Sequence, residues 1–229
     1  MSDFSDRDEK TGIQHLKGDS NFYVWKHSVK NKLVSYNYWN ITSGATPRPT
    51  YPSSESMTSI LEGQRVWDIW SCKAMCIICN ILSPEVSRSI SSHETAPAMW
   101  DALMQRFHHH EPHDLLKSFN AICSLRYSDD STESFRDYLA FFEERWDDLR
   151  YRCDDADPPV AGTGNSLETS LNVLTNSDQS KREFLIASLP KSMLSIVCNP
   201  QFEARSQVNY TCLCSALVRY NTLMESRKE

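Results

Sequence analysis

Between residues 135 and 149, apolar side chains recur every three or four positions, over about four turns of an α-helix. A half-buried strand would alternate at every second position instead, so this spacing predicts an amphipathic helix. The apolar positions are Phe135, Tyr138, Leu139, Phe142, Trp146 and Leu149. The charged residues among them are expected to face water, and they are Glu143, Glu144, Arg145, Asp147 and Asp148.

The same helical period continues through most of the chain, and no segment shows a convincing alternation of period two. Only six of the 229 residues are glycine, which leaves few positions for tight turns. We therefore predict an all-α fold, with short helices near the C-terminus over 178–188, 191–197 and 206–226. The expected apolar faces of the earlier helices are Phe22, Trp25, Val29 and Leu33, continued by Tyr36; Ile60, Leu61, Trp67, Trp70, Ala74, Ile77, Ile81 and Leu82; Trp100, Leu103, Met104 and Phe107; and Leu115, Leu116, Phe119, Ile122 and Leu125.

Capping residues and prolines indicate where these helices begin and end. Asp19 or Ser20 is expected to cap the first helix. Thr95 is expected to cap a later helix that has Pro97 in its first turn. The pair Ser83-Pro84 separates two helices, because proline disfavours helical geometry at the residue before it and itself fits a first-turn position.

Two segments are predicted to be loops. Residues 43–56 hold three prolines and several serines, and residues 153–166 hold two prolines and two glycines. Residues 129–134 offer several competing caps for the amphipathic helix that follows them. Residues 1–12 are mostly polar and acidic, and we expect them to form a flexible N-terminal arm.

Composition and charge limit the function of the chain. With 40% hydrophobic and 24% charged residues, it has the composition of a globular protein. No apolar run approaches the roughly 18 residues that a membrane span needs, and the polar start lacks the apolar core of a signal peptide. We therefore expect a cytoplasmic protein without membrane contact. The net charge of −6 and the scattered Lys and Arg residues argue against strong nucleic-acid binding by this chain alone.

Cys72, Cys76 and Cys79 share one face of a predicted helix, at positions i, i+4 and i+7. Without a secretory signal, buried reduced thiols in the core are the expected state of these three side chains. A metal site and a redox role remain as alternatives. Cys212 and Cys214 are two residues apart, a spacing that suits neither a tight disulfide nor a pair of zinc ligands.

Enzyme motifs are missing from the sequence. It contains no G-x-x-x-x-G-K-[ST], G-x-G-x-x-G, G-x-S-x-G or H-E-x-x-H motif, and no Asp-Thr-Gly or Asp-Ser-Gly triplet. The acidic pairs Glu143-Glu144 and Asp147-Asp148 are expected to be solvated rather than catalytic. We therefore predict that the protein is not an enzyme and needs no cofactor or metal.

His108, His109, His110 and His113 form the one cluster that invites a metal assignment. His109 and His113 have the i, i+4 spacing that can chelate a divalent ion on a helix. However, Pro112 lies between them and is expected to separate two helices. A solvated corner between helices is therefore the interpretation we favour. A pH-sensitive contact, since imidazoles gain charge at about pH 6, and a true metal site are the two alternatives.

A series of short motifs resembles the capsid region of the Gag polyprotein of copia-type (Pseudoviridae) LTR retrotransposons. The series opens at 16–26 (LKGDSNFYVWK), which is similar to that family's L-x-G-x-N-[FY]-x-x-W. It ends at 185–190 (LIASLP), which is similar to L-x-x-S-L-P. Each motif is weak alone, but their order over about residues 13–225 makes the set fairly specific. The motifs between the two ends are Trp39, the helix over 67–82, the segment 95–103 (TAPAMWDAL) and the S-[VF]-x-[ED]-[YF]-like element at 134–142.

This resemblance implies a two-lobed helical capsid protein, with an N-terminal lobe over 13–111 and a C-terminal lobe over 112–229. Residues 131–149 would resemble the major homology element of the second lobe. Such proteins assemble from rings of five and six subunits, bridged by C-lobe dimers, into shells around the element's RNA. The assembly residues suggested by family geometry are Met193, Val197, Leu213, Leu217 and Tyr220. The residues that define the fold are Trp25, Trp67, Trp100, Phe135, Tyr138, Trp146, Leu189 and Pro190, and the tryptophans among them are expected in the core.

One departure from the family pattern concerns RNA. Gag proteins commonly carry a C-x2-C-x4-H-x4-C zinc knuckle and a basic tail after the capsid, and neither occurs in this sequence. RNA would therefore be packaged through a region that this chain does not contain. The leading hypothesis is a self-assembling capsid protein that forms virus-like particles. The alternative is a domesticated or truncated Gag that acts as a helical interaction module, co-assembling with a parental capsid and regulating it.

Overall fold

The computed structural model describes residues 12–50, 57–108, 112–128, 133–155, 166–197 and 209–226. Within these ranges the chain is mostly helical, no segment forms a strand, and an isolated β-bridge joins Leu16 to Leu82. The prediction of an all-α fold is therefore confirmed.

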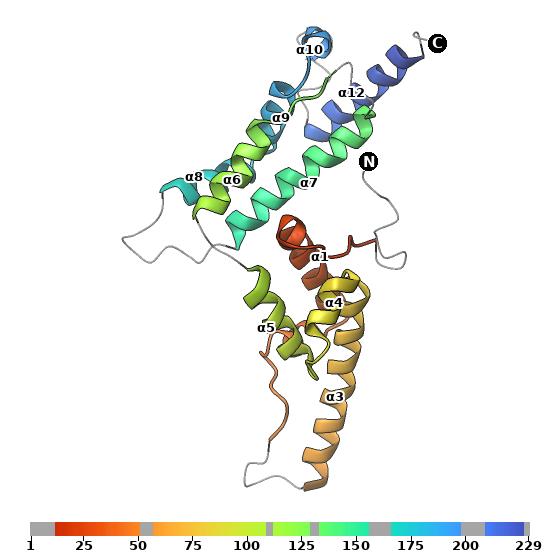
Figure 1. The fold of residues 1–229 in the computed structure, drawn as a ribbon, viewed down its shortest axis with the longest axis vertical. Coiled ribbons are helices and arrows are strands. Elements are labelled where there is room, and N and C mark those ends of the chain that lie inside the picture. Colours follow the sequence, from red (N-terminus) through yellow and green to blue (C-terminus); the bar gives the residue numbers. More distant parts are fainter. Residues whose placement is uncertain are drawn as a thin grey trace. The chain divides into compact units, whose positions relative to one another are not determined.

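The chain divides into two compact units, which lie within Asp3–His109 and within His110–Glu229 (Figure 1). The sequence placed its boundary slightly later, between residues 111 and 112. That these units are capsid lobes stays a prediction.

The described residues of the N-terminal unit form one 3-10 turn and five α-helices. They are η2 (Asp19–Asn21), α1 (Phe22–Ser35), α2 (Trp39–Thr42), α3 (Met57–Asn80), α4 (Pro84–Ile90) and α5 (Ala96–Phe107). Two predicted helix starts are confirmed, because the Ser83 hydroxyl accepts a hydrogen bond from the N–H of Val86 and the Thr95 hydroxyl from that of Ala98. In both helices a proline occupies the first turn.

The predicted cap of the first helix is wrong. Neither Asp19 nor Ser20 caps α1, because both residues belong to the short 3-10 turn that precedes it. The side chain of Asn21 instead ties the incoming chain to this turn. Its Oδ1 accepts from the N–H of Lys17 at 3.1 Å, and its Nδ2 donates to the carbonyl of His15 at 2.8 Å.

The core of the N-terminal unit gathers around the end of α3. The carbonyl oxygen of Ile81 accepts two hydrogen bonds, from Trp25 Nε1 at 2.8 Å and from the N–H of Leu16 at 3.0 Å. The Trp25 indole is stacked on Trp100, with ring centroids 5.9 Å apart, and the Trp100 ring meets Trp39 edge-on. All of these residues except Trp39 are buried, so the predicted core position of Trp25 and Trp100 is confirmed.

On α3, the structure corrects part of the predicted apolar face. Its buried side chains are Ile60, Trp67, Ser71, Ala74 and Ile78. Leu61 is 50% exposed and Trp70 is 44% exposed, so these two predictions are wrong. A helix turns by about 100° per residue, so Leu61 points well away from the core that its neighbour Ile60 faces.

The C-terminal unit is built around one long helix. Its helices among the described residues are α6 (Pro112–Cys123), α7 (Phe135–Asp154), α8 (Ser166–Thr175), α9 (Asp178–Ala187), α10 (Lys191–Val197) and α12 (Tyr210–Glu225). The central helix, α7, contacts α6, α8 and α12 (Figure 1). Helix α8 was not predicted, because its Ser, Thr and Asn residues have low helix propensity. The burial of Leu171 in the core of the unit stabilises this helix, and helix propensity does not include that stabilisation.

The amphipathic pattern of α7 is confirmed at each of its six apolar positions. All six side chains are buried, as are Leu185, Ser188 and Leu189 of the L-x-x-S-L-P motif. Ser134 caps the helix, because its hydroxyl accepts from the N–H of Asp137 at 3.2 Å. Trp146 Nε1 donates to the carbonyl of Thr175 at 3.2 Å and so satisfies the last residue of α8.

Asp148 is the exception on α7, because it was expected to face water but is only 4% exposed. Its Oδ2 accepts from Arg152 Nε at 2.8 Å and from the Ser118 hydroxyl of α6 at 3.3 Å. Its Oδ1 has no partner among the described residues. Burial raises the pKa of the Asp148 carboxyl, and the contacts with Arg152 and Ser118 oppose this shift. The helical period could not show that α6 covers this side of α7.

Trp146→Ala is expected to lower the free energy of unfolding of the C-terminal unit by about 3–5 kcal/mol, because it empties a buried aromatic site. Phe141→Ala on the same helix is the matched control. Phe141 is 38% exposed and lies under the guanidinium of Arg145, so its loss should cost less than about 1 kcal/mol. Urea denaturation followed by circular dichroism measures both changes, and equal costs would contradict the buried position of Trp146.

Asp148→Asn is expected to change how stability depends on pH. Because burial raises the pKa of Asp148 above its ordinary value of 3.8, the folded protein binds this proton more tightly than the unfolded protein does. The contribution of Asp148 to the stability of the wild type therefore falls as the pH rises from about 4 through the folded-state pKa. The stability of D148N relative to wild type, from urea denaturation, should rise over that range. A difference that does not vary with pH would contradict the raised pKa.

Candidate interaction surface

Helix α3 projects beyond the rest of the N-terminal unit. Figure 1 shows its N-terminal half reaching past α1, α4 and α5. The segment 46–50 runs beside this half and is fastened to it. Trp67 Nε1 donates to the carbonyl of Thr46 at 2.9 Å, and Gln64 Nε2 donates to that of Pro49 at 2.7 Å. The segment 46–50 therefore covers one side of the projecting helix, and another side is exposed to solvent.

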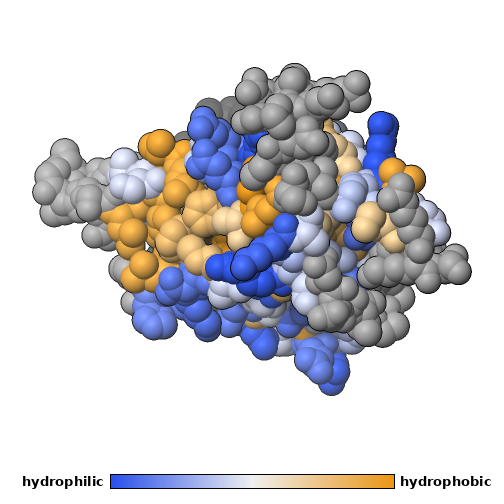
Figure 2. Space-filling model, turned by 90° about the horizontal axis from the view of Figure 1, so that it is seen from above, coloured by the Kyte–Doolittle hydropathy of each residue, from blue (hydrophilic) through white to orange (hydrophobic). Residues whose placement is uncertain are grey.

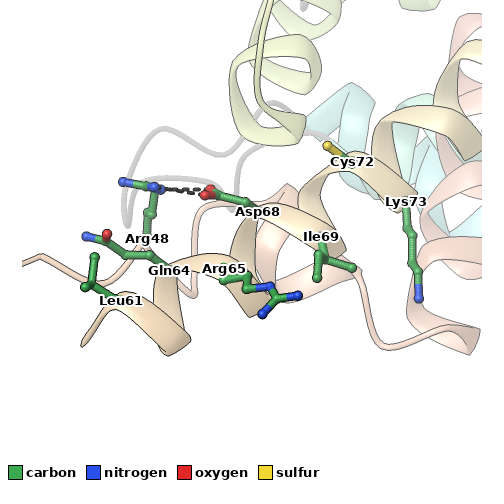
Figure 3. Close-up of a pocket in the computed structure, with 8 residues that line it drawn as sticks. All are labelled: Arg48, Leu61, Gln64, Arg65, Asp68, Ile69, Cys72 and Lys73. Carbon is green, nitrogen blue, oxygen red and sulfur yellow. Dashed lines mark hydrogen bonds and ion pairs between the residues drawn. The ribbon is translucent and has the colours of Figure 1, made fainter. Parts of the chain in front are cut away.

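An exposed ion pair marks the edge of the open side. Arg48 donates to Asp68 through Nε at 2.8 Å and through Nη2 at 2.9 Å, which is a bidentate arrangement (Figure 3). The hydrogen bond from Arg48 is the main cause that lowers the pKa of Asp68. The pair keeps Asp68 ionised and holds the Arg48 side chain against α3.

Beside this ion pair lies a shallow, open hollow of about 610 Å³. One wall is Arg48, and the rest is a single side of α3 (Figure 3). The lining residues of α3 are Leu61, Gln64, Arg65, Asp68, Ile69, Cys72 and Lys73. The hollow thus combines apolar side chains with both signs of charge.

The open side of α3 carries a continuous line of side chains, which we call the α3 stripe. It consists of Met57, Leu61, Arg65, Asp68, Cys72 and Cys76. Steps of four, four, three, four and four residues separate them, which keeps them within an arc of about 100° on the helix. Met57 is 65% exposed, and Leu61, Arg65, Cys72 and Cys76 are also exposed. Helix α3 therefore has an apolar face in the core and a second one in solvent.

The cysteine prediction is wrong for two of the three thiols. Cys72, Cys76 and Cys79 do share one face of a helix, but Cys72 and Cys76 lie on the solvent side. Only Cys79 is partly covered, and its Sγ lies 3.9 Å from Met99 Sδ of α5. The spacing identifies a common face, but it does not say whether that face turns inward.

The predicted assembly residues lie in the core of the C-terminal unit. Met193, Val197, Leu213 and Leu217 are buried there, and Tyr220 is half-buried against the same core. Their side chains therefore offer little surface to a second copy in this conformation. Their role in assembly stays a prediction. The motif residues Trp67, Phe135 and Tyr138 are buried as well, and Pro190 is half-buried.

The histidine cluster is described only in part. The ring of His108 is half-buried, with its centroid 5.8 Å from that of Tyr23, and His113 is exposed. His109 and His110 lie outside the described residues. Among the residues that are described, no three His, Cys, Asp or Glu side chains are placed to hold a metal ion.

The C-terminal unit also exposes apolar side chains. Figure 2 views the molecule from above, and hydrophobic residues gather in one area of the face seen there, bordered by hydrophilic ones. The large exposed apolar residues of this unit come from α6, α7, α8 and α12, and they are Leu116, Phe141, Leu167, Val173 and Leu223. Because four helices contribute, these residues do not form a line along one helix as the α3 stripe does.

Comparison with known proteins supplies no relative for this chain. No family model, no curated protein and no solved structure matches it. Within the described ranges, no helix has both the length and the apolar character needed to cross a bilayer.

We did not predict from the sequence that Met57, Arg65 and Asp68 share an exposed side of α3. The sequence does contain a signal for this side, because a second line of positions runs along α3 beside the buried line of Ile60 and Trp67. Two apolar lines on one helix are easily merged into a single broad face when only the sequence is read. Burial in the structure separates them.

The thiols of the α3 stripe should react before those of the core. We expect N-ethylmaleimide to label Cys72 and Cys76 rapidly in dilute native protein, together with the exposed Cys212. Cys153 and Cys214 are buried and should react only in denaturant, and burial raises the pKa of Cys214 to about 11. Mass spectrometry of timed samples measures the order, and equally fast labelling of Cys214 would contradict the structure.

Proposed function

We propose that this chain is a structural protein that assembles with copies of itself, as the resemblance to the capsid region of copia-type Gag implies. In this proposal it is not an enzyme. Its two helical units would act as the two lobes of a capsid subunit. The particles would form in the cytoplasm and enclose the element's RNA, which would be bound by a region that this chain does not contain.

The observation that carries the proposal is the exposed second face of α3. Folding of the single chain leaves Met57, Leu61 and Ile69 in water on one helix, beside the exposed thiols of Cys72 and Cys76. Aligned apolar side chains on a protein surface commonly mark a contact with another protein. A protein whose function is assembly needs such a surface on each copy.

The burial of the motif residues gives further support. Trp25 and Trp100 lie in the core of the N-terminal unit, and Phe135, Trp146 and Leu189 lie in that of the C-terminal unit. Residues that define a family's fold are expected in such positions. The motifs on which the resemblance rests therefore behave as structural motifs. Of these motifs, the helix over 67–82 also lines the hollow beside α3, through Asp68, Ile69, Cys72 and Lys73.

Electron microscopy across a salt series tests the proposal. The chain carries a net charge of −6, so added salt should screen the repulsion between copies and favour assembly. We expect closed, uniform shells in negative stain, with a matching rise in light scattering. A monomer at every salt and protein concentration would contradict self-assembly and would favour the alternative, a module that assembles only with a parental capsid.

Met57→Glu provides the matched variant for the same experiment. A carboxylate in the α3 stripe would have to be buried on assembly, so we expect this variant to form few or no shells. Val173→Glu adds the same charge at a position that is 70% exposed on α8 and should assemble like the wild type. An equal loss of shells in both variants would mean that added charge, rather than the α3 stripe, is responsible.

A further inference from the structure

We propose that two copies of this chain pair through their α3 helices in antiparallel orientation. The two-fold axis would cross the helix pair at the level between Val66 and Trp67. This inference rests on the proposed self-assembly, and it adds the surface, the orientation and the register of one contact.

The α3 stripe is symmetric about its own midpoint. Met57 and Cys76, Leu61 and Cys72, and Arg65 and Asp68 are each equally far from the point between residues 66 and 67. From its N-terminal end, the α3 stripe therefore consists of two apolar residues, a cation, an anion and two thiols. A two-fold axis at the midpoint sets each residue of the stripe opposite its counterpart in the second copy, because residues of an antiparallel pair meet in reverse order.

In this register the apolar ends of the stripe cover each other. Met57 faces Cys76 of the second copy, and Leu61 faces its Cys72. A thiol behaves as a small apolar group in such a contact. The two-fold axis makes each of these contacts twice, so all four apolar positions of both stripes leave water. The stripe spans about 28 Å of helix, which is long enough to fix the direction of a partner helix.

The charges at the centre select the same register. Arg65 is set opposite Asp68 of the second copy, and this pair also occurs twice. Arg65 is exposed, and Asp68 has lone pairs that its two hydrogen bonds from Arg48 leave available. A parallel pair would instead place Arg65 against Arg65 and Asp68 against Asp68, with like charges in contact.

Other registers use the stripe less well. If the axis passed at Cys72, Arg65 would meet Cys79 of the second copy, whose thiol is partly covered by Met99. The apolar residues Met57 and Leu61 would then reach past the far end of α3 and stay in water. Only the axis between residues 66 and 67 pairs all six positions.

The hollow beside the stripe provides space for a second helix. It is bounded by Leu61, Arg65, Asp68 and Cys72 of the stripe, and the half of α3 that carries Leu61 projects beyond α1, α4 and α5. A nucleic acid fits this surface less well, because Asp68 lies at its centre and the chain as a whole is negatively charged.

Leu61→Cys tests the register. In the proposed pair the new thiol lies opposite Cys72 of the second copy, so diamide should link the two by taking up two electrons and two protons from the thiols. Positions 61 and 72 are about 16 Å apart along one helix, so this disulfide cannot form within a single chain. We expect a covalent dimer of L61C, and L61C/C72S is the matched control that should not form it.

Peptide mapping identifies the linked positions. Trypsin cleaves after Arg65 and Lys73, so position 61, Cys72 and Cys76 fall in three different peptides. Mass spectrometry of an unreduced digest therefore distinguishes the expected link from position 61 to Cys72 from every other one. A dominant Cys72–Cys72 link, which can form only between two copies, would show a different register and would overturn the inference.

Charge reversal tests the two central ion pairs. Recovery in a mixture of two variants also distinguishes a lost contact from a misfolded protein. In the L61C background, Arg65→Glu places two acidic pairs in the contact and Asp68→Lys places two basic pairs. We expect each variant alone to give a severalfold lower yield of dimer. An equal mixture should restore the yield through heterodimers, because Glu at 65 then meets Lys at 68 and the native Arg65 meets the native Asp68. Failure of the mixture to recover, with both variants folded by circular dichroism, would contradict the pairing.

Light scattering on the same samples separates this inference from the proposed function. Assembly of L61C without the link between positions 61 and 72 would overturn the α3 pairing and leave self-assembly standing. The link without larger particles would support the pairing and count against a capsid. Neither link nor association at any concentration would overturn both.

Discussion

The carbonyl oxygen of Ile81 ties the N-terminal unit together. It lies just after the last residue of α3, where the carbonyls of a helix lack partners within the helix. The indole of Trp25 and the backbone N–H of Leu16 both donate to it. Both donors belong to buried residues, so each would be left unpaired without this acceptor, at a cost of about 1–3 kcal/mol. Fixing the end of α3 also fixes which side of α3 turns toward the core.

The orientation of α3 in turn determines what the surface offers. With Ile60, Trp67 and Ile78 held in the core, the α3 stripe must lie in solvent. The C-terminal unit uses a similar device on α7, where the indole of Trp146 donates to the carbonyl at the end of α8. In each unit a buried tryptophan thus satisfies a carbonyl at the end of a helix.

Much of the fold could be predicted from local patterns. The period of α7 and the caps Ser83, Thr95 and Ser134 depend on residues within one or two turns of each other, and a sequence contains that information. The sequence could not show which of two apolar lines on α3 is buried, nor that α6 covers Asp148. These properties depend on which helices meet, and the chain contains no local signal for that. The surface of Met57, Arg65 and Asp68 was missed for the same reason.

We propose that one helix serves both folding and assembly, with its inner face in the core and its outer face available to a second copy. A cryo-electron microscopy reconstruction of assembled particles tests this claim most directly, because it shows what covers α3. The account predicts the α3 helices of two subunits side by side and antiparallel, with Arg65 beside Asp68 of the neighbour. Particles in which the outer face of α3 is open to solvent in every subunit would contradict it.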